Sequence, residues 1–270
     1  MALFASEYQG GPSFEVFSSQ GSNPLANWKV SNQKGVKKVY EKAVKGYVYT
    51  CHAGPANKLQ LPKEERKGMT LVQPFLVLQG YFEEGVHFSL ELSVMDHGGT
   101  KRRIFLSSSF KEIKPTPLHC QVPFQGIKWG TWTSLVINVA DLVASCFPGQ
   151  TYRSTDMLIL SAAGRLRKVF TVKQPPPDTE DGYKGFNPLE VEAFPRTLEF
   201  PLGVECVTQV LDTAKLLAAC SVAGGGAHRP QSEPMASGAA ARTQKVLEGR
   251  NGQVAHLAFG ARVAGAHPKG

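Results

Sequence analysis

The stretch VHFSLELSVMDHGGTKRRIFL, residues 86–106, decides the fold class. In its first half, the apolar residues from Val86 to Val94 are separated by single polar residues. Alternation with a period of two is typical of a half-buried strand. Asp96-His97-Gly98-Gly99 has the composition of a turn, and Lys101–Leu106 follows as a return strand. The stretch therefore predicts an antiparallel hairpin with one face in a core.

Similar segments recur along the first 173 residues, and they are rich in β-branched, aromatic and aliphatic residues. Gly, Pro, Asn or Asp stands near most of their ends. One short helix is expected over Ala140–Phe147, before the helix-breaking Pro148-Gly149. This pattern predicts an all-β fold, an antiparallel sandwich or a barrel, with one short helix. The further strands are expected at Ser13–Phe17, Gly46–Cys51, Pro74–Gln79, Trp132–Val139, Met157–Ala162 and Leu166–Val172.

The composition of the whole chain excludes several classes of protein. The 270 residues are 42% hydrophobic and 9% aromatic, which is enough for a core and excludes disorder throughout. The sequence contains no run of about 18 apolar residues, so no membrane-spanning helix is predicted. The N-terminus lacks the basic and apolar regions of a signal peptide, and the five cysteines form no CxxC pair. We therefore expect free thiols in a reducing, cytoplasmic compartment.

Charge divides the chain into two parts. Residues 1–173 carry 21 Lys and Arg against 12 Asp and Glu, a net charge of +9. Residues 174–270 carry 9 against 10, a net charge of −1. A basic folded segment indicates an acidic partner, such as nucleic acid, an anionic membrane or an acidic protein surface. We expect a β-sandwich domain over residues 1–173 and a Pro/Gly/Ala-rich tail over residues 174–270.

The composition of the tail predicts little fixed structure. Residues 174–182 contain three prolines and are expected to form a linker. Residues 221–243 are rich in Ala, Gly, Ser and Pro, which indicates disorder. One amphipathic helix is expected over residues 204–219. Residues 254–260 form an apolar island, either a docking motif or a patch without a role.

Few residues indicate chemistry. The sequence contains no phosphate-binding loop, HExxH motif or serine elbow. The pairs Cys51-His52 and His119-Cys120 suggest zinc, but adjacent residues of a strand point to opposite faces. His87, Glu91 and Asp96 suggest acid–base catalysis, although two serines on the same face indicate the solvent side of a strand. We expect a non-enzymatic protein with no metal, no cofactor and no small-molecule substrate.

Two basic clusters are the candidate partner-binding residues. Arg165 and Arg167 are expected on one face of a strand, with Leu166, Phe170 and Val172 on the opposite face. If the two clusters lie on neighbouring strands, their cations form one patch; ordinary solvated strand edges are the alternative. The candidate residues are Lys101, Arg102, Arg103, Arg165, Arg167 and Lys168.

Other features bear on the choice of partner. The lysine-rich stretch Lys34–Lys45 is expected to be a solvated loop. Phe88, Phe105 and Phe170 have the alternation of core residues, which does not favour single-stranded nucleic acid, since its binders expose aromatic rings beside cations. Trp129 and Trp132 keep open a carbohydrate-binding sandwich as an alternative.

Eight strings occur in order along the chain: Glu7–Gly11, Gln60–Lys63, Pro74–Leu78, Phe88–Asp96, Lys101–Phe105, Trp132–Asp141, Gly164–Phe170 and Pro175–Thr179. Taken together, these strings resemble the cilia- and flagella-associated protein 20 domain family. The resemblance covers about residues 1–173, and within the family it is greatest to a larger member with a low-complexity tail.

The resemblance implies a β-sandwich of jelly-roll type and a non-enzymatic role in the ciliary axoneme or the centriole. The founding member lies at a junction of doublet microtubules and contacts tubulin. We therefore expect a structural protein of the cytoskeleton that binds microtubules or axonemal proteins through its basic face, and no membrane. The alternatives are a nuclear, nucleic-acid-associated protein and a carbohydrate-binding sandwich.

Overall fold

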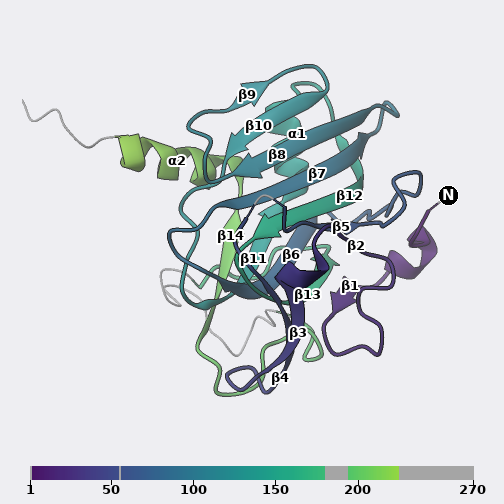
Figure 1. Cartoon of the computed structure of the whole chain (residues 1–270). Helices are drawn as coiled ribbons and strands as arrows, with labels where there is room; N and C mark the ends of the chain where they lie inside the picture. The colour runs from purple at the N-terminus through teal and green to yellow at the C-terminus, as the bar shows by residue number, and fades with distance from the viewer. Residues whose placement is uncertain (1, 55, 180–193, 225–270) are drawn as a thin grey trace, which may run out of the picture. The chain divides into compact units, whose positions relative to one another are not determined.

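Two β-sheets and two short α-helices make up the described part of the chain (Figure 1). The structure is a computed structural model that describes residues 2–54, 56–179 and 194–224. The chain divides into two units, Met1–Ala227 and His228–Gly270. The second unit lies wholly outside the described residues, so the fold below is that of the first.

The first sheet has seven strands, and β3 (Val36–Glu41) stands at one of its ends. β13 (Gly164–Val172) lies in the middle and also pairs with β1 (Ser13–Ser18). Apart from β1, the strand order across the sheet is β14 (Cys206–Leu211), β11 (Trp132–Asn138), β6 (Phe75–Phe82), β13 (Gly164–Val172), β4 (Gly46–Cys51) and β3 (Val36–Glu41).

The second sheet also has seven strands and contains the predicted hairpin. In it, Leu92 of β7 (Phe88–Asp96) pairs with Ile104 of β8 (Lys101–Ser107), as the alternation of the sequence requires. The order is β2 (Lys29–Val30), β5 (Leu59–Leu61), β12 (Tyr152–Ala162), β7 (Phe88–Asp96), β8 (Lys101–Ser107), β10 (His119–Pro123) and β9 (Lys114–Pro115).

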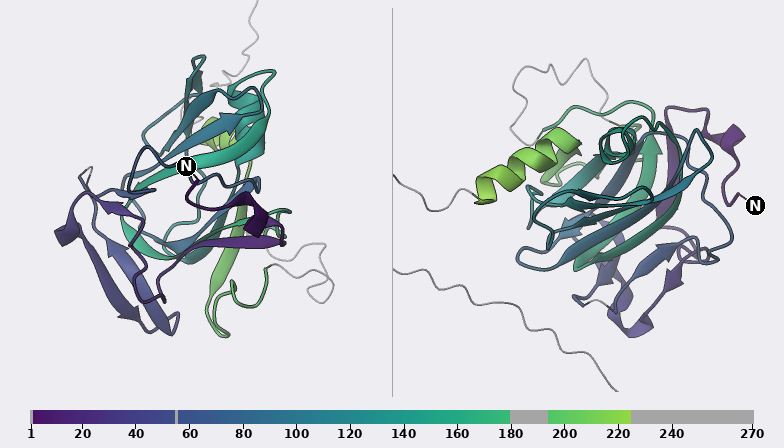
Figure 2. Two further views of the ribbon diagram at one scale, coloured as in Figure 1. Left: turned by 90° about the vertical axis from the view of Figure 1, so that its right-hand side faces the viewer. Right: turned by 90° about the horizontal axis from the view of Figure 1, so that it is seen from above.

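The two sheets pack face to face around one core, and Figure 2 shows them from two further sides. Leu78 and Leu135 of the first sheet and Leu92, Ile104 and Leu158 of the second belong to the same buried cluster. The predicted β-sandwich is therefore confirmed. The sheets are mixed rather than purely antiparallel, because β10 pairs parallel with β8 and β14 pairs parallel with β11.

The predicted short helix is confirmed as α1 (Val139–Cys146). Asn138 caps its start, since the Asn138 side chain accepts a hydrogen bond of 3.0 Å from the main-chain N–H of Asp141. Its apolar stripe is buried, including Leu142 and Cys146. A second helix, α2 (Thr213–Gly224), overlaps the second half of the helix predicted over residues 204–219.

A β-bulge in β13 changes the predicted alternation. The register against β6 shifts between Leu166 and Lys168, so one extra residue is inserted there. As a result Leu166 and Val169 face the core between the sheets, whereas Phe170 belongs to a cluster on the outer face of the first sheet. The prediction that Leu166, Phe170 and Val172 share a face was therefore wrong.

Residues 194–204, named here the return segment, cover that outer face. Phe194 and Leu198 pack against Phe170 and Val77, and Phe200 packs against Trp132. Beyond the segment, β14 extends the first sheet. Strand pairing with the edge of the sheet therefore replaces the first half of the helix predicted over residues 204–219.

Part of the predicted tail belongs to the folded unit. Asp178 and Thr179, predicted to lie in a linker, hold β14 by hydrogen bonds: Thr208 N donates to Thr179 Oγ1 over 2.8 Å, and Val210 N donates to Asp178 Oδ2 over 3.0 Å. The first four residues of the stretch 221–243, predicted to be disordered, belong to α2. The rest of that stretch and the apolar island at 254–260 lie outside the described residues. Among the described residues, no helix has the length and hydropathy of a membrane span.

Candidate interaction surface

The first basic cluster is split between the two faces of β8. Arg102 is opposite Val94, which belongs to the core, and therefore points to the inner side of the second sheet. There its Nε lies 2.8 Å from Asp96 Oδ2. Lys101 and Arg103 are exposed on the opposite face, and Arg103 forms an ion pair of 3.3 Å with Glu91. Only Lys101 and Arg103 can therefore present charge to a partner.

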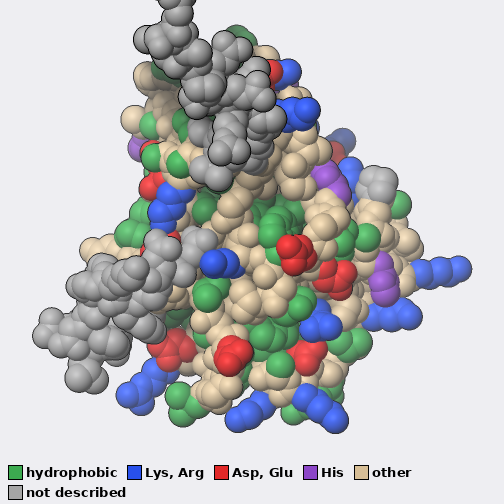
Figure 3. All heavy atoms as spheres, turned by 90° about the vertical axis from the view of Figure 1, so that its left-hand side faces the viewer, with side chains coloured by type: hydrophobic (Ala, Val, Ile, Leu, Met, Phe, Trp, Pro, Cys, Tyr) green, Lys and Arg blue, Asp and Glu red, His purple; other side chains and the backbone are tan. Residues whose placement is uncertain are grey.

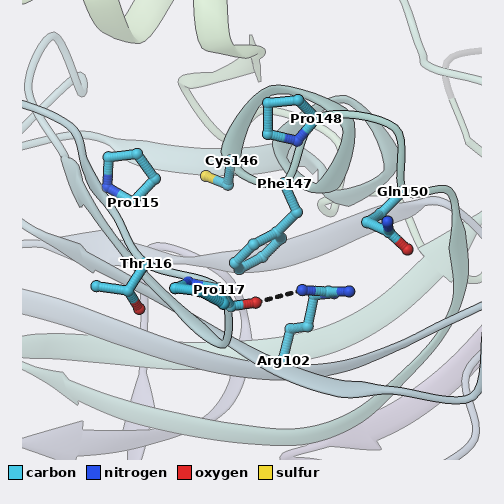
Figure 4. Close-up of a pocket in the computed structure, with 8 residues that line it drawn as sticks. All are labelled: Arg102, Pro115, Thr116, Pro117, Cys146, Phe147, Pro148 and Gln150. Carbon is cyan, nitrogen blue, oxygen red and sulfur yellow. Dashed lines mark hydrogen bonds between the residues drawn. The ribbon is translucent and has the colours of Figure 1, made fainter.

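Two further groups hold Arg102 in place. Its guanidinium donates to the carbonyl of Pro117 and lies 5.0 Å from the centre of the Phe147 ring (Figure 4). Arg102, Pro117 and Phe147 line a cavity of about 290 Å³ together with Pro148 and Gln150. These contacts assign Arg102 a structural role between β8 and the end of α1.

Asp96, the partner of Arg102, is a fully buried carboxylate. Burial alone would raise the pKa of Asp96. The N–H of Thr100, 2.7 Å from Asp96 Oδ1, together with the hydrogen bond and the charge of Arg102, outweighs burial and holds this pKa below its ordinary value. Asp96 is thus an ionised structural anchor and not part of the acid–base set considered from the sequence.

The second basic cluster lies on the first sheet and is largely covered. Arg167 is only 8% exposed, because it donates to Gln79 Oε1 and lies 5.2 Å from the ring centre of Phe200 in the return segment. Burial lowers the pKa of Arg167. Lys168 is buried and paired with Glu15.

Arg165 is the most accessible cation of the second cluster. It forms an ion pair of 3.4 Å with Glu41 and lies 4.9 Å from the ring centre of Tyr81. The two clusters belong to different sheets, so the six residues do not form the single patch considered from the sequence. On the face seen in Figure 3, Lys and Arg side chains are scattered, many of them toward the margins, and Asp and Glu side chains lie among them.

A third group of cations stands on an element whose composition predicted a solvated loop. Lys34, Lys37, Lys38, Lys42 and Lys45 are all exposed, and they lie on or beside the β3–β4 hairpin. The hairpin also exposes Tyr40 (58%) and Tyr47 (46%). The β-branched and aromatic residues Val36, Val39 and Tyr40 were the available signal for β3, but they do not alternate with polar residues, and the lysines around them obscured the signal.

Comparison with known proteins identifies the family. The sequence matches the CFA20 domain over residues 3–181. The chain belongs to the CFA20 domain family. The predicted resemblance is therefore confirmed, and β14 and the return segment lie beyond the matched CFA20 domain although they pack on its first sheet.

The relatives of this CFA20 domain chain fall into two groups. Cilia- and flagella-associated protein 20 of Caenorhabditis briggsae is 24% identical over 171 residues, 62% of this chain and 82% of the relative. The Chlamydomonas reinhardtii protein of the same name is 24% identical over 62% of this chain and 87% of the relative. WD repeat-containing protein 90 of Xenopus tropicalis is 35% identical over 103 residues, 37% of this chain but only 6% of the relative. The predicted ciliary and cytoskeletal localisation agrees with the names of the first group.

Within the CFA20 domain, the other candidate groups are dispersed. No three His, Cys, Asp or Glu side chains of the described residues are arranged to hold a metal ion. Cys51 is buried in β4, and burial raises its pKa to about 12, whereas Cys120 lies beside Cys146 of α1. Trp132 is buried beneath Phe200, so it cannot contribute to an exposed platform for a sugar ring.

Proposed function

We propose that the chain is a non-enzymatic structural protein of the cilium or centriole that binds the acidic surface of microtubules through exposed cations of its β-sandwich. Membership of the CFA20 domain family supports the ciliary part of this proposal. The net charge of +9 on residues 1–173 is the observation that supports an acidic partner. Of the six residues predicted from the sequence, the structure favours Lys101 and Arg103, because both are exposed on the outer face of β8.

Co-sedimentation of the full chain with microtubules tests the proposal. We expect the chain to pellet with microtubules at low salt and to be released as salt rises, because the Debye length shortens to about 8 Å at physiological ionic strength. Charge reversal at Lys101→Glu and Arg103→Glu together is expected to weaken pelleting about tenfold, since each exposed pair contributes up to about 1 kcal/mol.

A matched control separates a local surface from net charge. Lys63 and Arg66 are also exposed, but Glu64 and Glu65 stand between them. Lys63→Glu with Arg66→Glu makes the same change in net charge and is expected to leave pelleting nearly unchanged. Equal losses in the two double variants would reject a localised face on β8. Absence of pelleting by the unmodified chain at low salt would reject direct microtubule binding.

A further inference from the structure

The β3–β4 hairpin has an open strand edge with aromatic and basic side chains beside it. β3 is the last strand of the first sheet, and none of the described strands pairs with its outer side. Five lysines and one acidic residue lie between positions 34 and 47. The acidic residue, Glu41, is already paired with Arg165, so the lysines leave this end of the sheet strongly positive.

Hydrogen bonds of β4 show which main-chain groups of β3 are open. Tyr40 of β3 is opposite Tyr47 of β4. The N–H of Tyr47 donates to Gln20 Oε1 over 3.3 Å, and the carbonyl of Tyr47 accepts from Gln20 Nε2 over 2.8 Å, so neither group bonds to Tyr40. In an antiparallel pair such residues direct their N–H and C=O away from each other. The N–H and C=O of Tyr40 therefore point to the outer edge.

Alternation extends the same argument along β3. Residues two apart on a strand direct their main-chain groups to the same side, so Lys38 also presents its N–H and C=O to the outer edge. The bond from His52 N to the carbonyl of Gly35, over 3.0 Å, has the phase that this alternation requires. Lys38 and Tyr40 thus offer two successive sites of strand pairing.

The side chains beside this edge form one cluster. Tyr40 and Tyr47 meet edge to face, with ring centres 5.6 Å apart. The ammonium group of Lys38 lies 4.9 Å from the centre of the Tyr47 ring. In Figures 1 and 2 the hairpin stands at one end of the first sheet, away from the second sheet. Lys38 Nζ also donates a hydrogen bond of 3.1 Å to the carbonyl of Gly21, whereas Tyr40 remains 58% exposed at the outer edge.

We propose that the outer edge of β3 binds an acidic, extended segment of a partner protein, which adds to the first sheet as a further strand. Main-chain hydrogen bonds to Lys38 and Tyr40 would hold the segment, and the lysines would select its carboxylates. The proposal names the surface and the partner chemistry for the adhesive role above, and so rests on the proposed function.

Two observations favour this occupant over others. Lysines alone would protect a strand edge against pairing with another strand. The two exposed tyrosines favour such pairing, because aromatic side chains strengthen contacts between neighbouring strands. A single-stranded nucleic acid needs free ring faces for stacking, and one face of Tyr47 is covered by Lys38. A nucleic acid also cannot pair with the open N–H and C=O groups as an extended peptide does.

Fluorescence anisotropy with three labelled probes of equal length tests the proposal on the full chain. The first probe alternates Glu and Thr, the second alternates Glu and Pro, and the third is oligothymidylate. We expect the Glu-Thr peptide to bind tightest, because proline removes the N–H that strand pairing needs. Equal binding of the two peptides, or tighter binding of oligothymidylate, would overturn the proposal.

Variants locate the site. Lys38→Glu with Lys42→Glu is expected to weaken binding of the Glu-Thr peptide about tenfold, whereas Lys63→Glu with Arg66→Glu, an equal change of charge, is expected to leave it nearly unchanged. Tyr40→Pro removes the outward N–H and the ring, whereas Tyr40→Ser removes the ring alone, so the proline variant is expected to bind more weakly. If Tyr40→Pro does not melt cooperatively, the charge variants decide the question; equal binding by the two charge variants contradicts the proposed site.

Microtubule pelleting of the same variants separates this proposal from the proposed function. If the unmodified chain pellets and only the Lys101/Arg103 variant is released, the proposed function stands and the hairpin site fails for that partner. If the unmodified chain does not pellet but binds the Glu-Thr peptide at the hairpin, direct microtubule binding fails and the acidic-strand site stands.

Discussion

At the scale of single residues, adjacent arginines on β8 have opposite roles. Arg102 neutralises the buried carboxylate of Asp96, whereas Arg103 pairs with Glu91 at the surface. Arg102→Ala is expected to lower the free energy of unfolding by roughly 3–5 kcal/mol, because it leaves a buried charge without its partner. Arg103→Ala is the matched control and is expected to cost about 0–1 kcal/mol. Urea denaturation of both variants measures the difference, and similar losses would contradict the assigned roles.

The lowered pKa of Asp96 predicts how acid affects stability. A carboxyl whose pKa is lower in the folded state contributes stability that is fully present above its unfolded pKa of about 3.9. That contribution is lost as the pH falls through the lower, folded pKa. Asp96→Asn removes the titrating group, so the stability gap between this variant and the unmodified chain is expected to shrink below about pH 4. A gap of constant size from pH 7 to pH 3 would contradict the assignment.

At the scale of elements, Gly164 fixes the junction between β12 and β13. Its φ is +151°, and a Cβ atom there would lie 2.1 Å from the carbonyl oxygen of Tyr81 on the adjacent β6. Gly164→Ala is therefore expected to destabilise the fold by more than about 2 kcal/mol. Gly85 is the control, because its φ is +72° and a Cβ atom there would meet no other atom within 4 Å. Gly85→Ala carries only the conformational cost of about 1 kcal/mol; equal melting temperatures of the two variants would contradict the clash.

The elements that the sequence predicted correctly are those whose structure depends on a short, local pattern of residues. The β7–β8 hairpin and α1 follow from alternation and from an apolar stripe, and both are confirmed. The bulge near Arg167 depends on the register against β6, and β14 forms because it pairs with β11. Neither feature can be predicted from the residues of its own segment alone.

The candidate site was predicted less well, for a related reason. Alternation alone separates Arg102 from Lys101 and Arg103, but the identity of its partner, Asp96, depends on how the hairpin closes. Burial of Arg167 depends on the return segment, which begins beyond residue 193. The edge of β3 was not predicted, because a lysine-rich stretch is as typical of a solvated loop as it is of a strand at the edge of a sheet.

At the scale of the whole molecule, the composition and the structure place the end of the domain differently. Charge changes sign near Lys173, but the outer face of the first sheet is covered by residues that come later. Phe194 and Leu198 are buried there against Val77 and Phe170, and β14 occupies the edge of β11. A chain that ends at Lys173 therefore exposes a continuous apolar face and an unpaired edge.

This difference makes truncation a direct test of the architecture. A chain ending at Lys173 is expected to melt at a lower temperature and to bind the apolar dye ANS, because each large apolar side chain that it uncovers or removes contributes about 1.5–3 kcal/mol. A chain ending at Gly224 retains β14 and the return segment and is expected to melt like the full chain. Equal melting temperatures and equal dye binding for the two truncated chains would contradict the packing of the return segment. If the chain ending at Lys173 melts early, a loss of partner binding by that chain is explained by its uncovered sheet. Whether residues after Gly224 contribute to binding is then measured by comparing the chain ending at Gly224 with the full chain.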